Sequence, residues 1–453
     1  MVSLRFYGGV GEIGGNKILL EDGDTKIWLD FGQSFTMGCD YYVGWLQPRS
    51  SSILADLFEF NLLPKIAGLY DEELLEGTEI EGEPPDFDGV LISHAHADHV
   101  NHIEFLHPDL PVHAGAGTKL FMEAMEKTSG FVNYGEHDYR CFRTGDRLRI
   151  GSLDVEPVHV DHSIPSAYGH IIHTSEGAVA YTGDLRAHGP RADMTEEFLE
   201  KAADAKPIAL ITEGTRMAAS DRRKNLSEAE VLMGVKGICE EADRDGKMVL
   251  FTQGPRDMDR LRTFYSAARD CGRRVVVNPK TAHLLLRLVE DEYLDLPDPT
   301  TDEGLAVYFR RKRSGEYLEK DYYVWEREFL DRRISVEELK ERPQDHIFNL
   351  GFTHFAELVD IRPEAGTPFI YSMSEPFGEE DLEARVMHNW LEHFDLRYHQ
   401  LHASGHMSKK ELVDAIARIN PKKVFPVHTE HPEMFHKYLA CTVQPVLGET
   451  YHL

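Results

Sequence analysis

Cysteines are few in this 453-residue chain, and long apolar runs are missing. The five cysteines are odd in number and form no C-x-x-C pair: Cys39, Cys141, Cys239, Cys271 and Cys441. This pattern argues against a disulfide framework and favours a reducing cytosol. No apolar run is long enough to cross a bilayer, and the N-terminus leads straight into an expected strand at residues 4–7 without a signal peptide. We therefore expect a cytoplasmic protein with no membrane association.

Positive charge is also scarce. The sequence has 49 Lys and Arg against 78 Asp and Glu, a net charge of −29. Such a surface as a whole opposes non-specific binding of nucleic acid. A polyanionic substrate would need local positive charge or metal ions. The local clusters are either solvated mixed surface or anion-guiding sites: Arg222-Arg223-Lys224, Arg256, Arg260, Arg262, Arg273-Arg274 and Arg310-Arg311-Lys312-Arg313.

The length predicts two domains, or one domain that carries a large insertion. Up to about residue 213 the apolar runs are short and predict mainly strands. From about residue 217, helices expected at 227–241, 257–269 and 281–288 alternate with strands expected at 248–252 and 274–277. Strands that alternate with helices indicate a parallel α/β layer.

The densest group of metal-binding side chains follows an apolar strand expected at residues 90–92: His94, His96, Asp98 and His99. Apolar residues then continue at helical spacing, which predicts a helix after His99. Imidazole and carboxylate ligands suit zinc, and a hydrolytic zinc site leaves one position for water. The alternative is a polar loop that is rich in histidine by chance.

Other expected strands also end in polar side chains. Asp30 ends one strand, either as a ligand or, as we favour, as a group that orients the histidine loop from behind. His162 follows the strand at 153–160, and we prefer it to His159 and His170 because it stands at the turn just past the strand. Asp184 ends the strand after Gly183, and its carboxylate suits a bridge between two metals.

Late in the chain the pattern returns. The strand at 207–212 ends at Glu213, the strand at 396–401 ends at His402 with Ser404, Gly405 and His406 close behind, and the strand at 424–427 ends at His428.

Two further stretches have alternative interpretations. The glycine-rich residues 8–15 form either a phosphate-binding loop or, as we favour, a hairpin loop near the metal site, because a strand and not a helix follows. The aromatic residues 41–46 form an interface, a lid or, as we favour, a small satellite core.

Taken together, these motifs resemble the β-CASP family of metallo-β-lactamase-fold nucleases, nearest to its ribonuclease J branch. The metallo-β-lactamase motifs match Asp30, His94-x-His96-x-Asp98-His99, His162 and Asp184, and the three β-CASP motifs match Glu213, His406 and His428. The resemblance implies an αββα sandwich with an inserted parallel α/β domain: residues 1–213 and 391–453 form the sandwich and 214–390 the insertion. It also implies a short form without a C-terminal domain. The chain departs from the family in having Glu213-Gly214-Thr215 and His428-Thr429-Glu430 where Glu-Ser-Thr and His-Gly-Glu are usual.

The same resemblance implies two Zn²⁺ ions, with Mn²⁺ or Mg²⁺ as substitutes. It assigns His94, His96 and His162 to one ion, Asp98, His99 and His428 to the other, and Asp184 to both. It names Asp98, Glu213 and His406 as catalytic, and His402, Ser404 and Gly405 as phosphate-binding. The implied activity is hydrolysis of single-stranded RNA by a 5′–3′ exoribonuclease with a second, endonucleolytic activity, and a homodimer is compatible. The alternatives are a DNA nuclease of the β-CASP repair type, a small-molecule metallohydrolase and a non-enzymatic binding subunit.

Overall fold

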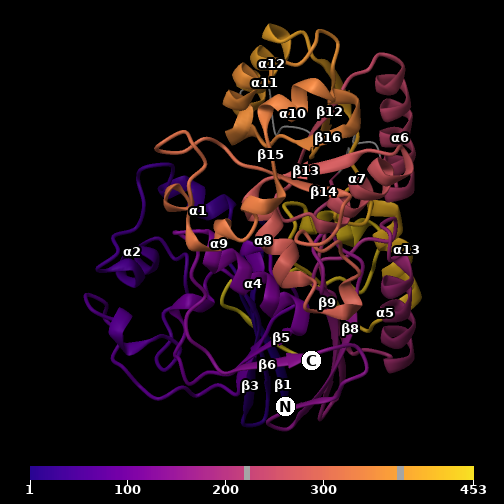
Figure 1. The fold of residues 1–453 in the computed structure, drawn as a ribbon. Coiled ribbons are helices and arrows are strands. Elements are labelled where there is room, and N and C mark those ends of the chain that lie inside the picture. Colours follow the sequence, from indigo (N-terminus) through magenta and orange to yellow (C-terminus); the bar gives the residue numbers. More distant parts are fainter. Residues whose placement is uncertain (219–224, 375–381) are drawn as a thin grey trace.

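Three β-sheets organise the protein, and two of them lie in one lobe (Figure 1). The computed structural model describes residues 1–218, 225–374 and 382–453. Both termini lie at the lower end of this first lobe, and the third sheet forms the upper lobe (Figure 1). The predicted architecture, an αββα sandwich with an inserted parallel α/β domain, is confirmed.

The first sheet is mixed, with an antiparallel part built from both ends of the chain. In order across the sheet its strands are β20 (Thr450–His452), β1 (Val2–Gly8), β2 (Lys17–Asp22), β3 (Thr25–Phe31), β4 (Gly89–Leu91), β5 (Val112–Gly115) and β6 (Tyr139–Phe142). β1 and β2 pair antiparallel, so residues 9–16 form the predicted hairpin loop. β20 pairs with β1 and was not predicted from the sequence.

The second sheet packs face to face on the first. Its order is β19 (Val424–Pro426), β11 (Ala209–Thr212), β10 (Gly177–Tyr181), β9 (Tyr168–Thr174), β8 (Leu153–His159) and β7 (Leu148–Ile150). Alternation along β4 shows how the layers form: Leu91 joins the core between the sheets, whereas Val90 and Ile92 join the core on the outer face. Helices α4 (Ala116–Thr128), α5 (Ala192–Ala205) and α13 (Lys409–Ile419) cover the outer faces.

The third sheet is wholly parallel. Its order is β15 (Arg333–Ile334), β14 (Leu305–Tyr308), β13 (Arg274–Val277), β16 (His346–Asn349), β12 (Val249–Gln253), β17 (Pro368–Ser372) and β18 (Arg397–Gln400). One face carries α6 (Glu228–Arg244), α7 (Met258–Asp270) and α8 (Pro279–Leu288). The other carries α10 (Val336–Glu341), α11 (Leu358–Ile361) and α12 (Leu382–His393). Covering both faces is the usual arrangement for a parallel sheet.

The sheet topology bears on the expected domain boundary at residues 390 and 391. β18 pairs in parallel with β17 and so belongs to the third sheet. We therefore propose that the chain returns to the sandwich after Gln400, about ten residues later than the resemblance implies.

Two local predictions were wrong. The helix expected after His99 is a single turn, α3 (Ala97–Val100), which begins before His99 and is followed only by a 3₁₀ turn at Ile103–Phe105. The aromatic residues 41–46 are not a satellite core. Although Tyr41 stacks on Phe60, Trp45 is 97% exposed, because Val43 and Leu46 bridge to each other in a tight surface turn that follows α1 (Thr36–Tyr41).

The remaining helices are short: α2 (Ile53–Glu59) and α9 (Val324–Arg327). Within the described residues, no helix combines the length and the apolar character needed to span a membrane.

Candidate metal centre

The histidine loop runs from the end of β4 to α3. The amide of His99 donates a hydrogen bond of 3.0 Å to the carbonyl of His96, which closes a tight turn in this loop. His94, Asp98 and His99 are buried, and His96 is half-buried. A charged or polar group buried in this way requires a partner, so the surrounding contacts decide what the loop can do.

The first cluster brings together three imidazoles and one carboxylate. Nδ1 of His96 lies 3.0 Å from Nε2 of His94 and 3.1 Å from Nε2 of His162. Asp184 completes this cluster, and the four candidate ligand atoms all lie within 4.8 Å of one another. A second cluster with the same spacing contains Asp98, His99, Asp184 and His428.

Asp184 belongs to both clusters. Its Oδ2 lies 3.2 Å from Nε2 of His99, 3.6 Å from Nε2 of His94 and 3.7 Å from Nε2 of His428. The other carboxylate, Asp98, lies with Oδ2 2.8 Å from Nε2 of His428. Residues from both ends of the chain therefore converge on one carboxylate.

The structure brings His162 to the cluster and leaves its two rivals elsewhere. The His159 ring stacks on Tyr168, with centroids 5.0 Å apart. His170 is buried beside Tyr181, with no hydrogen-bond partner for either ring nitrogen. Neither rival belongs to either cluster among the described residues.

Three of the clustered histidines are anchored through the ring nitrogen that faces away from the cluster. Nδ1 of His99 donates to Asp30 at 2.7 Å, and Nδ1 of His162 donates to the carbonyl of Gly405, also at 2.7 Å. Nδ1 of His428 lies 2.8 Å from the hydroxyl of Thr215. Such outer partners fix the tautomer and leave Nε2 free as a ligand, as in most protein metal sites.

Asp30 is a buried hub behind the histidine loop. Its carboxylate accepts hydrogen bonds from the Ser93 amide and hydroxyl, both at 2.7 Å, and from the Tyr181 hydroxyl at 2.5 Å, in addition to His99. Its φ of +56° lies in the left-handed region, which Asp tolerates better than most residues. Asp30 belongs to neither candidate ligand cluster.

The protonation states differ between the clusters. Burial lowers the pKa of His94 and His162 well below the usual value and that of His96 to about 4, so these rings are neutral. Burial also opposes charge on His428, but the carboxylates of Asp184 and Asp98 outweigh it and raise its pKa to about 9. The second cluster thus favours positive charge, which a metal ion would supply in place of the proton.

The donor set fits a divalent metal. Neutral imidazoles and carboxylates are zinc and manganese ligands, and Oδ1 of Asp184 is buried without a hydrogen-bond partner. His428 itself has a φ of +51°, a strained conformation for a non-glycine residue, held by a 2.8 Å bond from its amide to the carbonyl of Gly9. The cluster is a site for a divalent metal ion.

A second histidine system borders the cluster. Oε1 of Glu213 lies 3.5 Å from Nδ1 of His406, and it is buried without a hydrogen-bond partner. The other carboxylate oxygen of Glu213 accepts from the amide of Thr215 at 2.7 Å. The His406 ring lies 5.3 Å from that of His162 and 5.5 Å from that of His428, measured between centroids. Glu213 and His406 are therefore within reach of each other and of the cluster.

The loop that carries His402, Ser404, Gly405 and His406 is held from the upper lobe by Arg260. This fully buried guanidinium donates to Glu228 at 2.8 Å, to the carbonyl of Ala403 at 3.0 Å and to Nδ1 of His402 at 3.3 Å. Burial and the charge of Arg260 lower the pKa of His402 to about 3. His402 is therefore neutral, and its Nδ1 also lies 3.4 Å from the carbonyl oxygen of Ser372.

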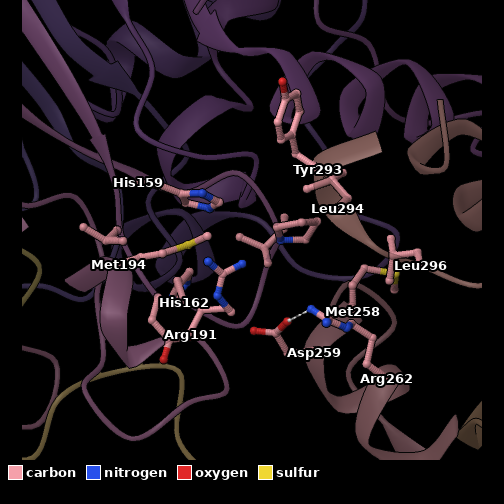
Figure 2. Close-up of a pocket in the computed structure, with 14 residues that line it drawn as sticks. His159, His162, Arg191, Met194, Met258, Asp259, Arg262, Tyr293, Leu294 and Leu296 are labelled. Carbon is pink, nitrogen blue, oxygen red and sulfur yellow. Dashed lines mark ion pairs between the residues drawn. The ribbon is translucent and has the colours of Figure 1, made fainter. Parts of the chain in front are cut away.

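Arg186 joins the lobes on the far side of His162. It donates to Asp161 at 3.0 Å and to Asp259, on α7, at 2.7 Å. Figure 2 shows the adjoining pocket of about 40 Å³, where Asp259 also pairs with Arg262 and where His162 forms part of the wall. A space of this size can hold ordered water.

Sequence reasoning missed Ser93, Tyr181, Arg186 and Thr215. Only Thr215 stands inside a quoted motif, and no local pattern marks the other three. It also misjudged two cationic residues: Arg260 and Arg273 are buried, and Arg273 donates to the carbonyls of Lys247 and His346. Residues 222–224 lie outside the described residues.

Two family profiles match the chain. A beta-lactamase superfamily domain matches residues 64–235, and a Zn-dependent metallo-hydrolase RNA specificity domain matches residues 394–440, which include the His402–His406 loop and His428.

Several relatives are ribonucleases J. The chain is 24% identical over 357 residues to ribonuclease J of Sinorhizobium meliloti, covering 75% of this chain and 57% of that protein. It is 28% identical over 443 residues to ribonuclease J of Helicobacter pylori, covering 95% of this chain and 56% of that protein. The chain thus spans just over half the length of these relatives. A crystal structure of a protein of unknown function from Enterococcus faecalis has the same fold, with a TM-score of 0.78, 24% identity and full coverage of both chains.

Proposed function

We propose that this chain, which is a ribonuclease J-like protein of the β-CASP group within the metallo-β-lactamase fold, is a metal-dependent ribonuclease that hydrolyses RNA phosphodiesters. The observation that carries the proposal is the convergence of two metal-ligand clusters with the Glu213–His406 pair. A metal site alone would suit many classes of hydrolase. The buried Glu213 beside His406, at the border of the metal clusters, suits proton transfer to a leaving oxygen. The RNA specificity profile over residues 394–440 supports the choice of RNA.

Seven residues would hold two Zn²⁺ ions, or Mn²⁺ or Mg²⁺ in their place. We assign His94, His96 and His162 to the first ion, Asp98, His99 and His428 to the second, and Asp184 to both. Ions bound there would supply an activated water and positive charge for the phosphate oxygens. Asp98 also contributes directly to catalysis, because it lies against His428 at the border with His406.

His406 is the proposed general acid for the leaving 3′ oxygen. Its Nδ1 faces Glu213 and Thr215, so Nε2 is the nitrogen on the opposite edge of the ring and carries the proton that is transferred. The unpartnered Oε1 of Glu213 would accept a hydrogen bond from Nδ1–H of the charged ring. A buried carboxylate in that position stabilises the imidazolium.

The loop before His406 would bind the scissile phosphate. The His402 ring, the Ser404 hydroxyl and the Gly405 amide would supply hydrogen bonds of the kind that stabilise a developing negative charge. Arg260 supports this role indirectly, because it holds the loop at Nδ1 of His402 and at the carbonyl of Ala403.

Single-stranded RNA is the proposed partner, guided by local positive charge. Arg310, Arg311 and Arg313 are exposed, and the charge of Arg256 is close enough to the cluster to contribute to the low pKa of His96. Arg260 and Arg273 are excluded from this role because they are buried. A homodimer through the exposed turn at Trp45 is compatible with this proposal, as is a cytoplasmic location.

One experiment tests both the activity and its polarity. The protein is incubated with 5′-monophosphate, 5′-triphosphate and circular RNAs of one sequence, with single-stranded DNA of equal sequence as a competitor. We expect mononucleotide release from the 5′-monophosphate RNA, which identifies a 5′–3′ exoribonuclease, and cleavage of the circle would reveal an endonuclease. Preferred cleavage of the DNA would favour the DNA-repair alternative. Intact substrates in all four arms, with a lactone or thioester hydrolysed instead, would favour a small-molecule hydrolase.

A further inference from the structure

A single hydroxyl lies between two histidines that the proposed function uses. Oγ1 of Thr215 is 2.8 Å from Nδ1 of His428 and 3.1 Å from Nδ1 of His406, although these residues are 213 and 191 positions away in sequence. The contact with His428 is one of the outer anchors of the metal cluster, and the contact with His406 joins the same hydroxyl to the proposed acid.

The direction of the first hydrogen bond follows from what His428 must do. A ring that gives the Nε2 lone pair to a metal carries its only proton on Nδ1, and a doubly protonated ring, bonded through Nε2 to Asp98, carries one there too. In both states Nδ1–H of His428 donates to the Thr215 oxygen. The hydroxyl oxygen is therefore an acceptor toward His428.

His406 acts as an acid only as the charged ring, in which Nδ1 carries a proton and donates. The Thr215 oxygen at 3.1 Å is the nearer acceptor for this N–H, with Oε1 of Glu213 at 3.5 Å as the second. The Thr215 oxygen then accepts from both rings, and its own hydrogen is left for the carbonyl oxygen of His428, 3.5 Å away. The Thr215 side chain is itself held in place, because its amide donates to Glu213 at 2.7 Å and its β-branched χ1 has few rotamers.

We propose that Thr215 is a positioning residue that couples the second metal cluster to the general acid. Its hydroxyl holds His428 with Nε2 toward the metal and holds His406 with Nε2–H on the edge that the substrate approaches. The part of this inference that concerns His406 rests on the proposed function. The part that concerns His428, called the His428 half below, is about metal binding and does not depend on RNA cleavage.

The first test measures metal binding without substrate. Metal-free protein is titrated with Zn²⁺ in competition with a chromogenic chelator. Thr215→Val keeps the shape of the side chain and removes only the hydroxyl. We expect the lower-affinity metal site of this variant to bind Zn²⁺ 10- to 100-fold more weakly, which is the usual effect of removing an outer partner of a metal ligand. Thr215→Ser should stay within about threefold of the parent protein.

Thr429→Val is a matched control, because Thr429 is buried one residue after His428 but its hydroxyl accepts from the amide of His431 instead. We expect its metal affinity to equal that of the parent. Parental affinity in Thr215→Val, or equal losses in Thr215→Val and Thr429→Val, would overturn the proposal. So would loss of the folded circular dichroism spectrum in Thr215→Val alone, since the residue would then be merely structural.

The second test asks whether Thr215 acts through His406. With RNA at saturating metal, we expect Thr215→Val to lower kcat at least tenfold with little change in KM, and to cause no further loss in a His406→Ala background. A full further loss in that background would refute the coupling. If the parent protein cleaves no RNA, the proposed function fails, but the metal titration still decides the His428 half.

Discussion

Replacing Asp30 with Asn removes one charge from the centre of the outer hydrogen-bond system while keeping its shape. Asn tolerates the left-handed φ of +56°, so the backbone has no reason to move. The Asp30 carboxylate is an acceptor for four donors, namely the amide and hydroxyl of Ser93, the Tyr181 hydroxyl and Nδ1–H of His99. An Asn side chain offers one acceptor oxygen, and its NH₂ group must face either the three donors on Oδ2 or the Ser93 amide on Oδ1.

The two hydroxyls can rotate and become acceptors, but the N–H of His99 has a fixed direction. With the NH₂ group toward His99, the ring leaves a buried donor without a partner, at a cost of about 1–3 kcal/mol, or moves its proton to Nε2, which then has no lone pair for a metal. With the oxygen toward His99, the amide of Ser93 loses its acceptor at a similar cost, and the start of the histidine loop loses its anchor. We expect the affinity of the second cluster for Zn²⁺ or Mn²⁺ to fall 10- to 100-fold, which corresponds to about 1.4–2.8 kcal/mol.

The assay is titration of the metal-free protein, with Asp22→Asn as the matched control. Asp22 is also buried and also accepts from the amide and hydroxyl of one serine, Ser175, at 2.7 and 2.5 Å, but no histidine is bonded to it. Asp22→Asn should bind metal like the parent protein. Equal affinities in Asp30→Asn and the parent would show that the orientation of His99 does not depend on this carboxylate, and would refute the reasoning.

Three further predictions follow from the same geometry. Asp184→Ala should abolish cleavage and strip the metal, because both clusters share its carboxylate, whereas His406→Ala should keep the metal and lose about 10²- to 10⁴-fold in kcat; full activity in His406→Ala would rule out the acid role. His428 has a pKa raised to about 9 in the metal-free fold, so its contribution, at most about 3 kcal/mol, is complete below about pH 6.5 and disappears as the pH rises through 9. Thermal melts of metal-free protein across this range should show that loss, and a melting temperature that rises with pH would contradict it. Arg310→Ala with Arg313→Ala should weaken binding of single-stranded RNA and reduce the slope of log affinity against log salt by about 1.4, and an unchanged slope would exclude this surface as a guide.

Local pattern alone was enough to locate most of the chemistry. Each ligand candidate follows a short apolar run, and burial of such a run as a strand depends mainly on the residues within it. Helix starts are also encoded locally, because the Ser-x-x-Glu spacing at Ser227 and Ser408 forms capping boxes. His162 could be preferred to His159 for the same reason, because only His162 lies beyond the strand.

What the sequence could not decide is which segments become neighbours. β19 lies beside β11, which puts His428 next to Glu213 and Thr215, and no local pattern encodes that pairing. Charge does not indicate burial either. Arg260 fits an exposed position by sequence, whereas the fold buries it in contact with both lobes. Sequence chemistry determined which residues could bind metal and move protons; long-range packing decided which of them share a hydrogen bond, because contacts between distant segments depend on the fold as a whole.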